Sequence, residues 1–446
     1  MNKLLVLSAA VVSLLIPITS FSQGPLDPGS GPLASMKSLE ELWNAIEVLS
    51  NKLAETEASL QSLSNAVAVT YDAAEAARVW ALSAAEAAAA ASNRVTALAS
   101  SQTLVTRAPV TTLVDTNGNT GVYNSMALTP QGNPAISYFN ASSADLMYAE
   151  WDGVQWVIST VYTNGDTGYY TSLAMQPGTG YPGISFMDWT ASNLMYAGWS
   201  GTEWVIHTVD SAGCVGFGNS LAFTAAGWPA ISYYDNDNGR VKYAGWNGSG
   251  WTYHTLATDV GVGTWPDTSL AFTDSGTTPA IGFYDPRATF VRYAVWNGSA
   301  WDIYAVDAAT NLAEASEISL AFTPAGEPAM AYHDNAGDGL TYAENGAGGW
   351  TVQVVDGGPS RGRFADLAFN AAGNPCISYM DGYTGSLKYA EWNGSSWNRQ
   401  TACRVLSGVY TSLALTPLGH PIISHAVGFD GSWDYHLALT EILPAP

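Results

Sequence analysis

The fold class that the sequence predicts is an all-β seven-bladed β-propeller, preceded by a long α-helical coiled-coil stalk. Three observations predict it. A unit of nearly constant length recurs seven times, the last copy lacks a strand that stands ahead of the first copy, and a heptad pattern of apolar residues precedes the repeats. With 47% hydrophobic residues among 446, the chain can bury a substantial core, which excludes a wholly disordered protein.

Composition and charge restrict the partners. The 38 acidic residues outnumber the 15 Lys and Arg residues, and the formal net charge is −23. Because such a surface repels a phosphate backbone, no nucleic acid partner is expected. The three cysteines are too few and too unevenly spaced to predict a disulfide framework or a metal site. No cofactor is predicted.

Residues 1–22 have the features of a signal peptide. Lys3 precedes an apolar run, and Ser20 and Ser22 provide small residues before the cleavage point. These features predict a bacterial protein that is secreted or belongs to the cell envelope, extracellular or periplasmic, with no transmembrane segment after cleavage. The alternative is an uncleaved anchor, although the run is shorter than the ~20 residues that a spanning helix needs. Residues 23–35 are rich in Pro and Gly and predict a flexible linker.

Residues 36–100 predict a coiled-coil oligomerisation helix. Between Leu39 and Leu98, glycine is absent, and apolar or small residues recur at alternating spacings of three and four. A lone helix would leave this stripe in water, so we expect copies of the chain to bury it in a homo-oligomer through 39–98. The alternative is a single helix packed on the following domain. At ~1.5 Å per residue, the rod would be about 90 Å long.

One part of this helix resembles a known coil. The run Leu63-Ser-Asn-Ala-Val67 is followed by an alanine-rich stretch. This pattern resembles the trimeric coil of bacterial outer-membrane lipoprotein over roughly half of the helix. The resemblance implies that the homo-oligomer is a trimer.

The segment 106–446 is repetitive. A Ser-Leu-Ala-like triplet, a proline and a tyrosine occur in this order in every copy, and successive copies are 46 to 50 residues apart. The triplets begin at Ser125, Ser172, Ser220, Ser269, Ser319, Asp366 and Ser412. The prolines are Pro134, Pro182, Pro229, Pro279, Pro328, Pro375 and Pro421, and the tyrosines are Tyr148, Tyr196, Tyr243, Tyr293, Tyr342, Tyr389 and Tyr435.

Each copy predicts four short antiparallel strands. In the third copy these are 220–224, 229–234, 241–246 and 251–256. The last two are joined through Asn247-Gly, a dipeptide favoured in tight hairpins because it tolerates positive φ. A sheet of four short strands cannot bury both of its faces alone, whereas seven sheets arranged radially bury them on one another.

The ends of the repeat region predict a closed ring. The seventh copy ends without a fourth strand, and the segment 109–115, ahead of the first copy, aligns with the fourth strand at 204–210. We therefore expect 109–115 to complete the last blade, beside the strand that contains Tyr435. An open array of sheets would have no use for such a segment.

The repeat also resembles a known family. The third copy contains Gly227-Trp-Pro-Ala-Ile-Ser-Tyr-Tyr-Asp235, followed by Val241-Lys-Tyr-Ala-Gly-Trp246. The pattern is similar to secreted bacterial and archaeal repeat proteins with G-x-P-x-I-S-Y-x-D and L-x-Y-A-x-W segments, a largely uncharacterised family, and the resemblance spans all seven copies. It implies the propeller architecture but no chemistry, since propellers include binding modules and enzymes alike.

Candidate site residues fall in two sets of loops on one face of the ring. The loops between the second and third strands carry an acidic or amide residue at equivalent positions. These side chains could bind a cation or sugar hydroxyls, or could accept hydrogen bonds from the backbone of their own turns, as Asp and Asn commonly do. They are Asn140, Asp188, Asp235, Asp285, Asp334 and Asp381.

The second set lies in the loops that enter each blade, where the copies differ most. Aromatic side chains beside a few polar groups favour recognition of a carbohydrate or a peptide, and the alternative is that the rings cover the interfaces between blades. Arg361 and Arg363 could clamp an anion or could offset local negative charge. The set comprises Tyr123, Tyr169, Tyr170, Phe217, Trp265, Glu314, Glu317, Arg361, Arg363, Phe364 and Tyr410.

Two recurring features predict packing and not chemistry. The tryptophans on either side of the hairpins, such as Trp246 and Trp251, predict cross-strand contacts. The serine that opens each inner strand predicts a hydrogen-bond partner for backbone that lines the channel. A serine nucleophile would instead need a histidine and an acid beside it, which the pattern does not provide.

The combined prediction is a secreted or cell-surface recognition or adhesion protein without enzymatic activity. Several propeller heads on an oligomeric stalk would bind a glycan or a surface protein ligand by avidity. Two alternatives stay open: a glycosidase or polysaccharide lyase with a propeller fold, in which paired carboxylates act, and a purely structural surface scaffold. The six histidines show no zinc-binding spacing, and the S-x-D-x-G-x-x-W boxes of sialidases are absent.

Overall fold

The structure is a computed structural model and describes two separate parts of the chain. It describes Glu47, Asn51, Lys52 and Ser59, which have helical backbone, and residues 109–443 except 259, 263–266, 274–275, 308–317, 335–338, 359, 405–406 and 429–433. The chain divides into the units Met1–Thr103 and Leu104–Pro446. The predicted signal peptide, linker and nearly all of the coiled coil lie outside the described residues, so these remain predictions. No helix within the described part is long and apolar enough to cross a bilayer.

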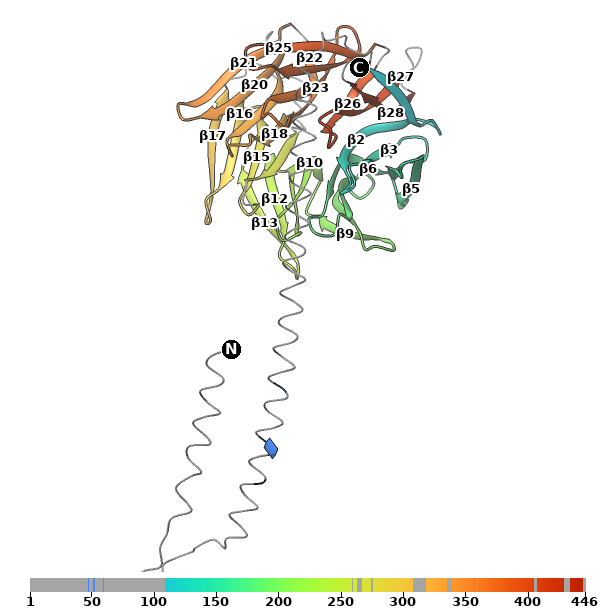
Figure 1. Ribbon diagram of the computed structural model, residues 1–446. Helices are drawn as coiled ribbons and strands as arrows, with labels where there is room; N and C mark the ends of the chain where they lie inside the picture. The colour runs from blue at the N-terminus through green and yellow to red at the C-terminus, as the bar shows by residue number, and fades with distance from the viewer. Residues whose placement is uncertain are drawn as a thin grey trace, which may run out of the picture. The chain divides into compact units, whose positions relative to one another are not determined.

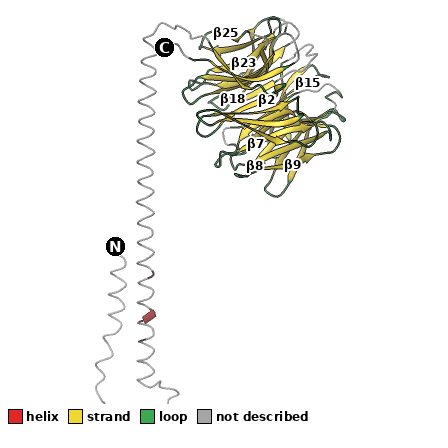
Figure 2. Cartoon of the chain, turned by 90° about the vertical axis from the view of Figure 1, so that its right-hand side faces the viewer, coloured by secondary structure: helices red, strands yellow, loops and turns green. Residues whose placement is uncertain are grey.

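The described strands form seven four-stranded antiparallel sheets arranged in a ring (Figure 1, Figure 2). This is the seven-bladed β-propeller that the sequence predicts. Blade 1 contains β2 (Thr120–Leu128), β3 (Pro134–Asn140), β4 (Asp145–Trp151) and β5 (Trp156–Tyr162). Blade 2 contains β6 (Thr167–Met175), β7 (Pro182–Asp188), β8 (Asn193–Trp199) and β9 (Trp204–Asp210). Blade 3 contains β10 (Val215–Phe223), β11 (Pro229–Asp235), β12 (Arg240–Trp246) and β13 (Trp251–Ala257).

The remaining blades repeat this order. Blade 4 contains β14 (Thr268–Phe272), β15 (Pro279–Asp285), β16 (Phe290–Trp296) and β17 (Trp301–Asp307). Blade 5 contains β18 (Ile318–Phe322), β19 (Pro328–Asp334), β20 (Gly339–Gly346) and β21 (Gly349–Asp356). Blade 6 contains β22 (Arg361–Phe369), β23 (Pro375–Asp381), β24 (Ser386–Trp392) and β25 (Trp397–Cys403). Blade 7 contains β26 (Ser407–Leu415), β27 (Pro421–Gly428), β28 (Tyr435–Glu441) and β1 (Val110–Asp115).

The position of a strand within its blade sets its burial. The second strand of a blade is covered on both faces by neighbouring blades, and β11 is buried along its whole length. The fourth strand is the outer edge, and every residue of β13 is exposed or half-buried. Because the apolar second strand cannot be covered within its own sheet, the blades must pack against one another to form the core.

The ring closes between the two ends of the repeat region. β1 pairs antiparallel with β28, from Val110 opposite Glu441 to Asp115 opposite Leu437. This pairing is the one that the sequence predicts. It makes β1, the first strand of the propeller in the sequence, the outer edge of the last blade. Closure leaves no blade without a neighbour on either face.

A belt of side-chain hydrogen bonds joins the seven inner strands. Ser172 Oγ, for example, accepts a hydrogen bond from the backbone N–H of Leu221 in the next blade at 2.9 Å. In blade 6 an aspartate takes the place of serine, and Asp366 Oδ2 accepts from the N–H of Leu413 at 2.7 Å. The belt confirms the backbone-satisfying role predicted for these serines. The other members are Ser125 with Leu173, Ser220 with Leu270, Ser269 with Leu320, Ser319 with Leu367 and Ser412 with Met126.

The hairpin between the third and fourth strands of blade 3 has the predicted bounds, but only one of the two positive φ angles expected at Asn247-Gly248. Trp246 pairs with Trp251, so the loop between them has four residues. Gly248 has a positive φ and Asn247 does not; the Asn247 side chain instead accepts the backbone N–H groups of Ser249 and Gly250 at 3.0 Å. The two indole rings pack edge to face with centroids 5.6 Å apart, which agrees with the cross-strand packing predicted for them.

Candidate functional site

The inner strands of five blades begin with a bulge that sequence reasoning missed. β10 begins at Val215, five residues before the predicted start, and its pairing with β11 shifts register on either side of Phe217. The sequence signature is a glycine four residues before the serine or aspartate of the belt. These glycines, with φ between 86° and 109°, are Gly121, Gly168, Gly216, Gly362 and Gly408.

Close contact between blades requires these glycines. A Cβ added at Gly408 would lie 2.9 Å from the Cα of Leu387, and one at Gly168 would lie 3.0 Å from the Cα of Leu146. The opposing atoms are backbone atoms in the third strand of the preceding blade, which cannot rotate aside. A glycine is therefore needed both for the left-handed φ and for the space.

Two residues after each glycine, the backbone again adopts a left-handed conformation. The φ angle is 52° at Tyr123, 53° at Tyr170, 55° at Phe364 and 55° at Tyr410, and blade 3 has Gly218 at the same position. An aromatic residue with positive φ costs about 1–3 kcal/mol of backbone strain, which glycine avoids. Four blades thus carry an aromatic side chain at a position where the backbone conformation favours glycine.

The strained residues are held in place by the neighbouring blade. The hydroxyl of Thr171 donates to the carbonyl oxygen of Tyr123 at 2.7 Å, and the side-chain amide of Asn124 donates to that of Tyr410 at 2.7 Å. Thr411 makes the same bond to the carbonyl of Phe364 at 2.6 Å. At Tyr123, Tyr170 and Tyr410 the residue that follows the strained position therefore binds the bulge of the blade before it.

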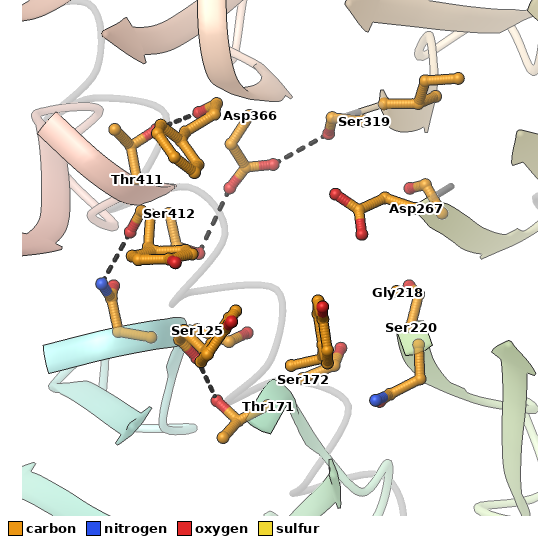
Figure 3. A pocket seen from close by; sticks show the side chains of 18 of the residues that line it. Ser125, Thr171, Ser172, Gly218, Ser220, Asp267, Ser319, Asp366, Thr411 and Ser412 are labelled. Atoms are coloured by element: carbon orange, nitrogen blue, oxygen red, sulfur yellow. Dashed lines mark hydrogen bonds between the residues drawn. The ribbon is translucent and has the colours of Figure 1, made fainter. Parts of the chain in front are cut away.

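The rings line a cavity of about 410 Å³ at the centre of the propeller, here called the central cavity. All seven inner strands contribute to its wall (Figure 3). The wall combines aromatic rings with the hydroxyl and carboxylate groups of the belt, a composition typical of small-ligand sites. Its residues are 123–125, 170–172, 218–220, 267–269, 318–319, 363–366 and 410–412.

Four rings form a continuous arc along one side of the central cavity. Tyr123 is central: its ring centroid lies 4.7 Å from that of Tyr170 and 4.6 Å from that of Tyr410. Phe364 extends the arc 4.8 Å beyond Tyr410. The Tyr123 hydroxyl forms hydrogen bonds with both neighbouring tyrosines, while burial raises its pKa. Because each ring packs against its neighbours, the four rings form one continuous aromatic surface.

Asp267 belongs to blade 4, which contributes no ring to the arc. Its carboxylate points into the open centre (Figure 3). The side chain remains partly exposed to the cavity, yet protein surrounds it on most sides, and this burial raises the pKa of its carboxyl to about 7. Its charge adds to burial, the main cause, in raising the pKa of the Tyr123 and Tyr170 hydroxyls. A carboxyl that is partly protonated at neutral pH can both donate and accept hydrogen bonds.

Asp366, the second carboxylate of the cavity, is occupied by the belt. Besides the Leu413 N–H, it accepts the hydroxyl of Ser319 at 2.8 Å and that of Ser412 at 3.3 Å. Burial raises the pKa of this carboxyl, and the hydrogen bonds oppose the rise. Both carboxylate oxygens already have protein partners, so Asp366 has a mainly structural role.

The central cavity contains only part of the aromatic and basic set predicted from sequence. Tyr123, Tyr170, Arg363, Phe364 and Tyr410 line it. Arg363 lies beside the Phe364 ring. The pKa of His333 is lowered mainly by burial of its own side chain and, to a smaller extent, by the positive charge of Arg363.

The other six members of that set lie elsewhere or outside the described residues. Tyr169 is not among the residues of the cavity wall, and its ring stacks on that of Trp189 with centroids 5.2 Å apart. Phe217 is 2% exposed and packs in the core. Arg361 is engaged by Asp356 at 3.2 Å and Asp381 at 3.8 Å, so it is not a free anion clamp. Trp265, Glu314 and Glu317 lie outside the described residues.

The acidic residues between second and third strands do not line the central cavity. Asp188 Oδ1 accepts the backbone N–H of Ala191 at 2.9 Å, and Asp285 Oδ1 accepts that of Ala288 at 3.0 Å. Their geometry matches the alternative in which each side chain satisfies its own turn. Asn140, Asp235 and Asp381 make equivalent bonds, and Asp334 is buried.

Sequence reasoning missed Asp267 as a site residue and assigned Asp366 no role beyond its place in the repeat. Asp267 precedes a belt serine by two positions, where four other blades have an aromatic residue. Alignment of the copies on that serine would have identified it as one of two charged exceptions, the other being Glu317 in the fifth copy.

Comparison with family models and with curated proteins finds no match. Solved structures of similar shape include AofleA from Arthrobotrys oligospora, at 16% identity over 73% of this chain and 94% of that chain, with a TM-score of 0.47. The SapL1 lectin in complex with alpha methyl fucoside has 15% identity over 63% and 96%, with a TM-score of 0.46. The polysaccharide lyase Uly1 has 10% identity over 74% and 90%, with a TM-score of 0.48. Similarity at this level carries no argument about activity, and strand pairing alone establishes the fold.

Proposed function

We propose that the propeller is a recognition module that binds a saccharide in the central cavity. The observation that carries the proposal is the aromatic arc, in which Tyr123, Tyr170, Phe364 and Tyr410 are held at strained backbone positions around one cavity. A fold that needs only to close its channel could use glycine at all of these positions, as it does at Gly218. Strain retained at one site supports a function for the side chains placed there.

The chemistry of the wall supports a polyhydroxylated ligand. Tyrosine rings offer flat apolar faces for the C–H faces of a sugar ring, and their hydroxyls offer hydrogen bonds at the edges. The Asp267 carboxyl adds a group that can accept or donate across the cavity. At about 410 Å³, the space is within the usual range for small-ligand sites.

A glycosidase is the second candidate, and one observation favours it. The raised pKa of Asp267, about 7, is that of a general acid able to work at neutral pH. Hydrolysis would also need a second carboxylate as base or nucleophile. Among the described residues that line the cavity the other carboxylate is Asp366, which is occupied by three protein donors. This difference makes binding without turnover the better-supported function.

The setting of the module follows from the sequence and completes the proposal. Secretion through the signal peptide 1–22 would place the protein outside the cytoplasm or in the cell envelope. The coiled coil 36–100 would then present several propellers on one stalk, so that weak sites gain avidity through effective concentration. A surface protein carrying a glycan would serve equally as the partner.

A glycan array probed with the full-length chain tests the function. We expect binding to a restricted set of saccharides, reduced at least tenfold by Tyr170→Ala or Asp267→Asn. Tyr383→Ala is the control, because Tyr383 is 83% exposed on a turn that does not line the cavity. Mass spectrometry of the bound saccharide after prolonged incubation separates the candidates: an intact saccharide supports recognition, and a cleaved one supports the glycosidase.

A further inference from the structure

A second space lies between blades 1 and 2 and shares no residue with the central cavity. This inter-blade groove has a volume of about 440 Å³. Its wall includes Tyr148, Glu150 and Ser159 of blade 1 and Pro182, Trp199 and Trp204 of blade 2.

A single repeat position explains why the groove is open. Tyr148 on β4 pairs across the sheet with Ser159 on β5. In the next five blades the residue opposite the equivalent tyrosine is larger in every case. These residues are His207, His254, Tyr304, Gln353 and Gln400.

The two histidines occupy the space that is empty beside Ser159. The His207 ring lies 6.3 Å from Tyr196 and 6.0 Å from Trp246, and thus between the tyrosine of its own blade and a tryptophan of the next. The His254 ring lies 4.8 Å from Trp296 in the same way. Because a serine side chain cannot reach the facing indole, the space at blade 1 stays open.

The aromatic walls of the groove stand at steep angles to one another. The ring of Tyr148 lies 5.4 Å from that of Trp204 with 69° between their planes. Trp199 lies 5.4 Å from Trp204 with 65° between their planes. Steeply angled rings enclose a rounded group on several sides, whereas a sugar-stacking platform presents one flat face.

The charge of the groove is negative. Tyr148 donates its hydroxyl to Glu150 Oε2 at 2.7 Å, which fixes this carboxylate in the wall. Asp152 also lines the groove, and hydrogen bonds from the Gln155 and Val154 backbone lower its pKa, so it is ionised at neutral pH. The lining residues include no Lys, Arg or His.

We infer that the inter-blade groove binds an organic cation of the quaternary ammonium class. Indole faces attract such cations through the ring quadrupole, tryptophan most strongly, and a nearby carboxylate adds a charge of the right sign. The inference concerns a different site and a different ligand class from the proposed function and does not depend on it.

Isothermal titration calorimetry of the full-length chain with choline chloride tests the inference. The comparison ligand is the neutral alcohol in which carbon replaces the quaternary nitrogen. We expect one choline per chain and binding at least about tenfold tighter than that of the neutral alcohol. Glu150→Gln, which keeps an acceptor for the Tyr148 hydroxyl, should weaken choline binding and leave the neutral alcohol unaffected.

Two further variants exchange residues between equivalent positions of different blades. Ser159→His installs the residue that blades 2 and 3 already have, so the fold should tolerate it, and choline binding should fall at least tenfold. Gln353→Ser should create a second site at the interface of blades 5 and 6. There Tyr342 donates to Glu344 at 2.7 Å and Trp397 lies 5.5 Å from Tyr342, as in the groove. The stoichiometry should rise from one choline per chain to two.

Several results would overturn the inference. These are equal binding of choline and the neutral alcohol, no choline binding at all, or choline binding that survives Ser159→His. Binding of a methyl glycoside in place of choline, lost in Ser159→His, would assign the groove to sugars. Asp267→Asn must leave choline binding unchanged; if it abolishes binding, the cation occupies the central cavity. Gln353→Ser keeps the test decisive even if Ser159→His does not fold.

Discussion

The hydroxyl oxygen of Ser412 accepts a hydrogen bond from the backbone N–H of Met126 at 3.1 Å, although 286 residues separate them in the chain. This bond joins blade 7 to blade 1 and completes the belt around the axis. Each belt bond crosses one blade interface, so the belt couples all seven inner strands. Its contribution to stability can be measured one bond at a time.

Ser412→Ala should destabilise the propeller by about 1–2 kcal/mol, because it leaves a partly buried backbone N–H without its acceptor. Thermal denaturation should show a lower unfolding midpoint. Ser249→Ala is the matched control: its hydroxyl bonds only to Asn247 in an exposed hairpin, and its effect should stay within about 0.5 kcal/mol. Equal effects of the two substitutions would contradict the role of the belt.

Gly408→Ala should destabilise the protein far more than Gly394→Ala. Both glycines have a φ of 93°, so the conformational cost of adding a Cβ is the same. Only the Cβ at position 408 would meet the Leu387 backbone, at 2.9 Å, while nothing lies within 4 Å of the one at 394. We expect about 1 kcal/mol for Gly394→Ala and at least twice that for Gly408→Ala. Urea denaturation of both variants measures the difference, which isolates the steric contact between blades.

Tyr170→Gly should be more stable than Tyr170→Ala by about 1 kcal/mol. Both substitutions remove the ring from the aromatic arc, but only glycine relieves the left-handed backbone at φ 53°. Thermal denaturation of the pair measures the strain directly, and binding in the central cavity should be weakened equally in both. If the two variants have the same midpoint, the bulge is not strained.

Stability should depend on pH through Asp267. The folded-state pKa of about 7 lies above the value of about 3.9 for an unfolded Asp. Between these values the folded protein binds the proton of Asp267 more tightly than the unfolded chain does. The free energy of unfolding therefore falls as the pH rises from about 4 to 7. Asp267→Asn should therefore raise the unfolding midpoint at pH 8 and change it little at pH 4. A constant difference across this range would show that Asp267 titrates normally.

Sedimentation of the full-length chain should show a trimer, and removal of residues 36–100 should give a monomer. The apolar stripe at 39–98 predicts burial between copies of the chain, and the resemblance to the trimeric coil of outer-membrane lipoprotein implies three copies. A monomeric full-length chain would favour the alternative of a single helix packed on the following domain. Glycan-array signals of the two forms should then differ by avidity only if the trimer exists.

The repeat architecture could be predicted because it depends on short sequence patterns within each copy. Pro229 and Trp251 begin strands at the predicted positions in the third copy, since strand starts follow the repeated proline and tryptophan. The closure through β1 was predictable from one missing strand. These features depend on alternating apolar and polar residues and on turn residues that recur in the copies. An assignment made in one copy can therefore be tested against the others.

The functional geometry was less predictable because it depends on contacts between blades. Gly216 and Gly218 suggest a loop in isolation, yet they belong to β10, where the register with β11 shifts and Gly216 lies against Leu194 of the preceding blade. Tyr123 and Phe217 were predicted to belong to one set of site residues, but not that one lines the cavity and the other is buried. The groove beside Ser159 is likewise visible only when facing blades are compared.

The closure of the ring through β1 also fixes an order of events. β1 is synthesised before every other strand of the propeller, while β28, its partner, is synthesised last. During translation, blades 1 to 6 can form as their four consecutive strands emerge, but blade 7 must wait for the end of the chain. Until then β1 has no partner, and the flanks of blades 1 and 6 lack a neighbour. A nascent chain stalled before β28 would therefore expose an unpaired strand, which makes late truncation a more serious risk for aggregation than its small share of the sequence suggests.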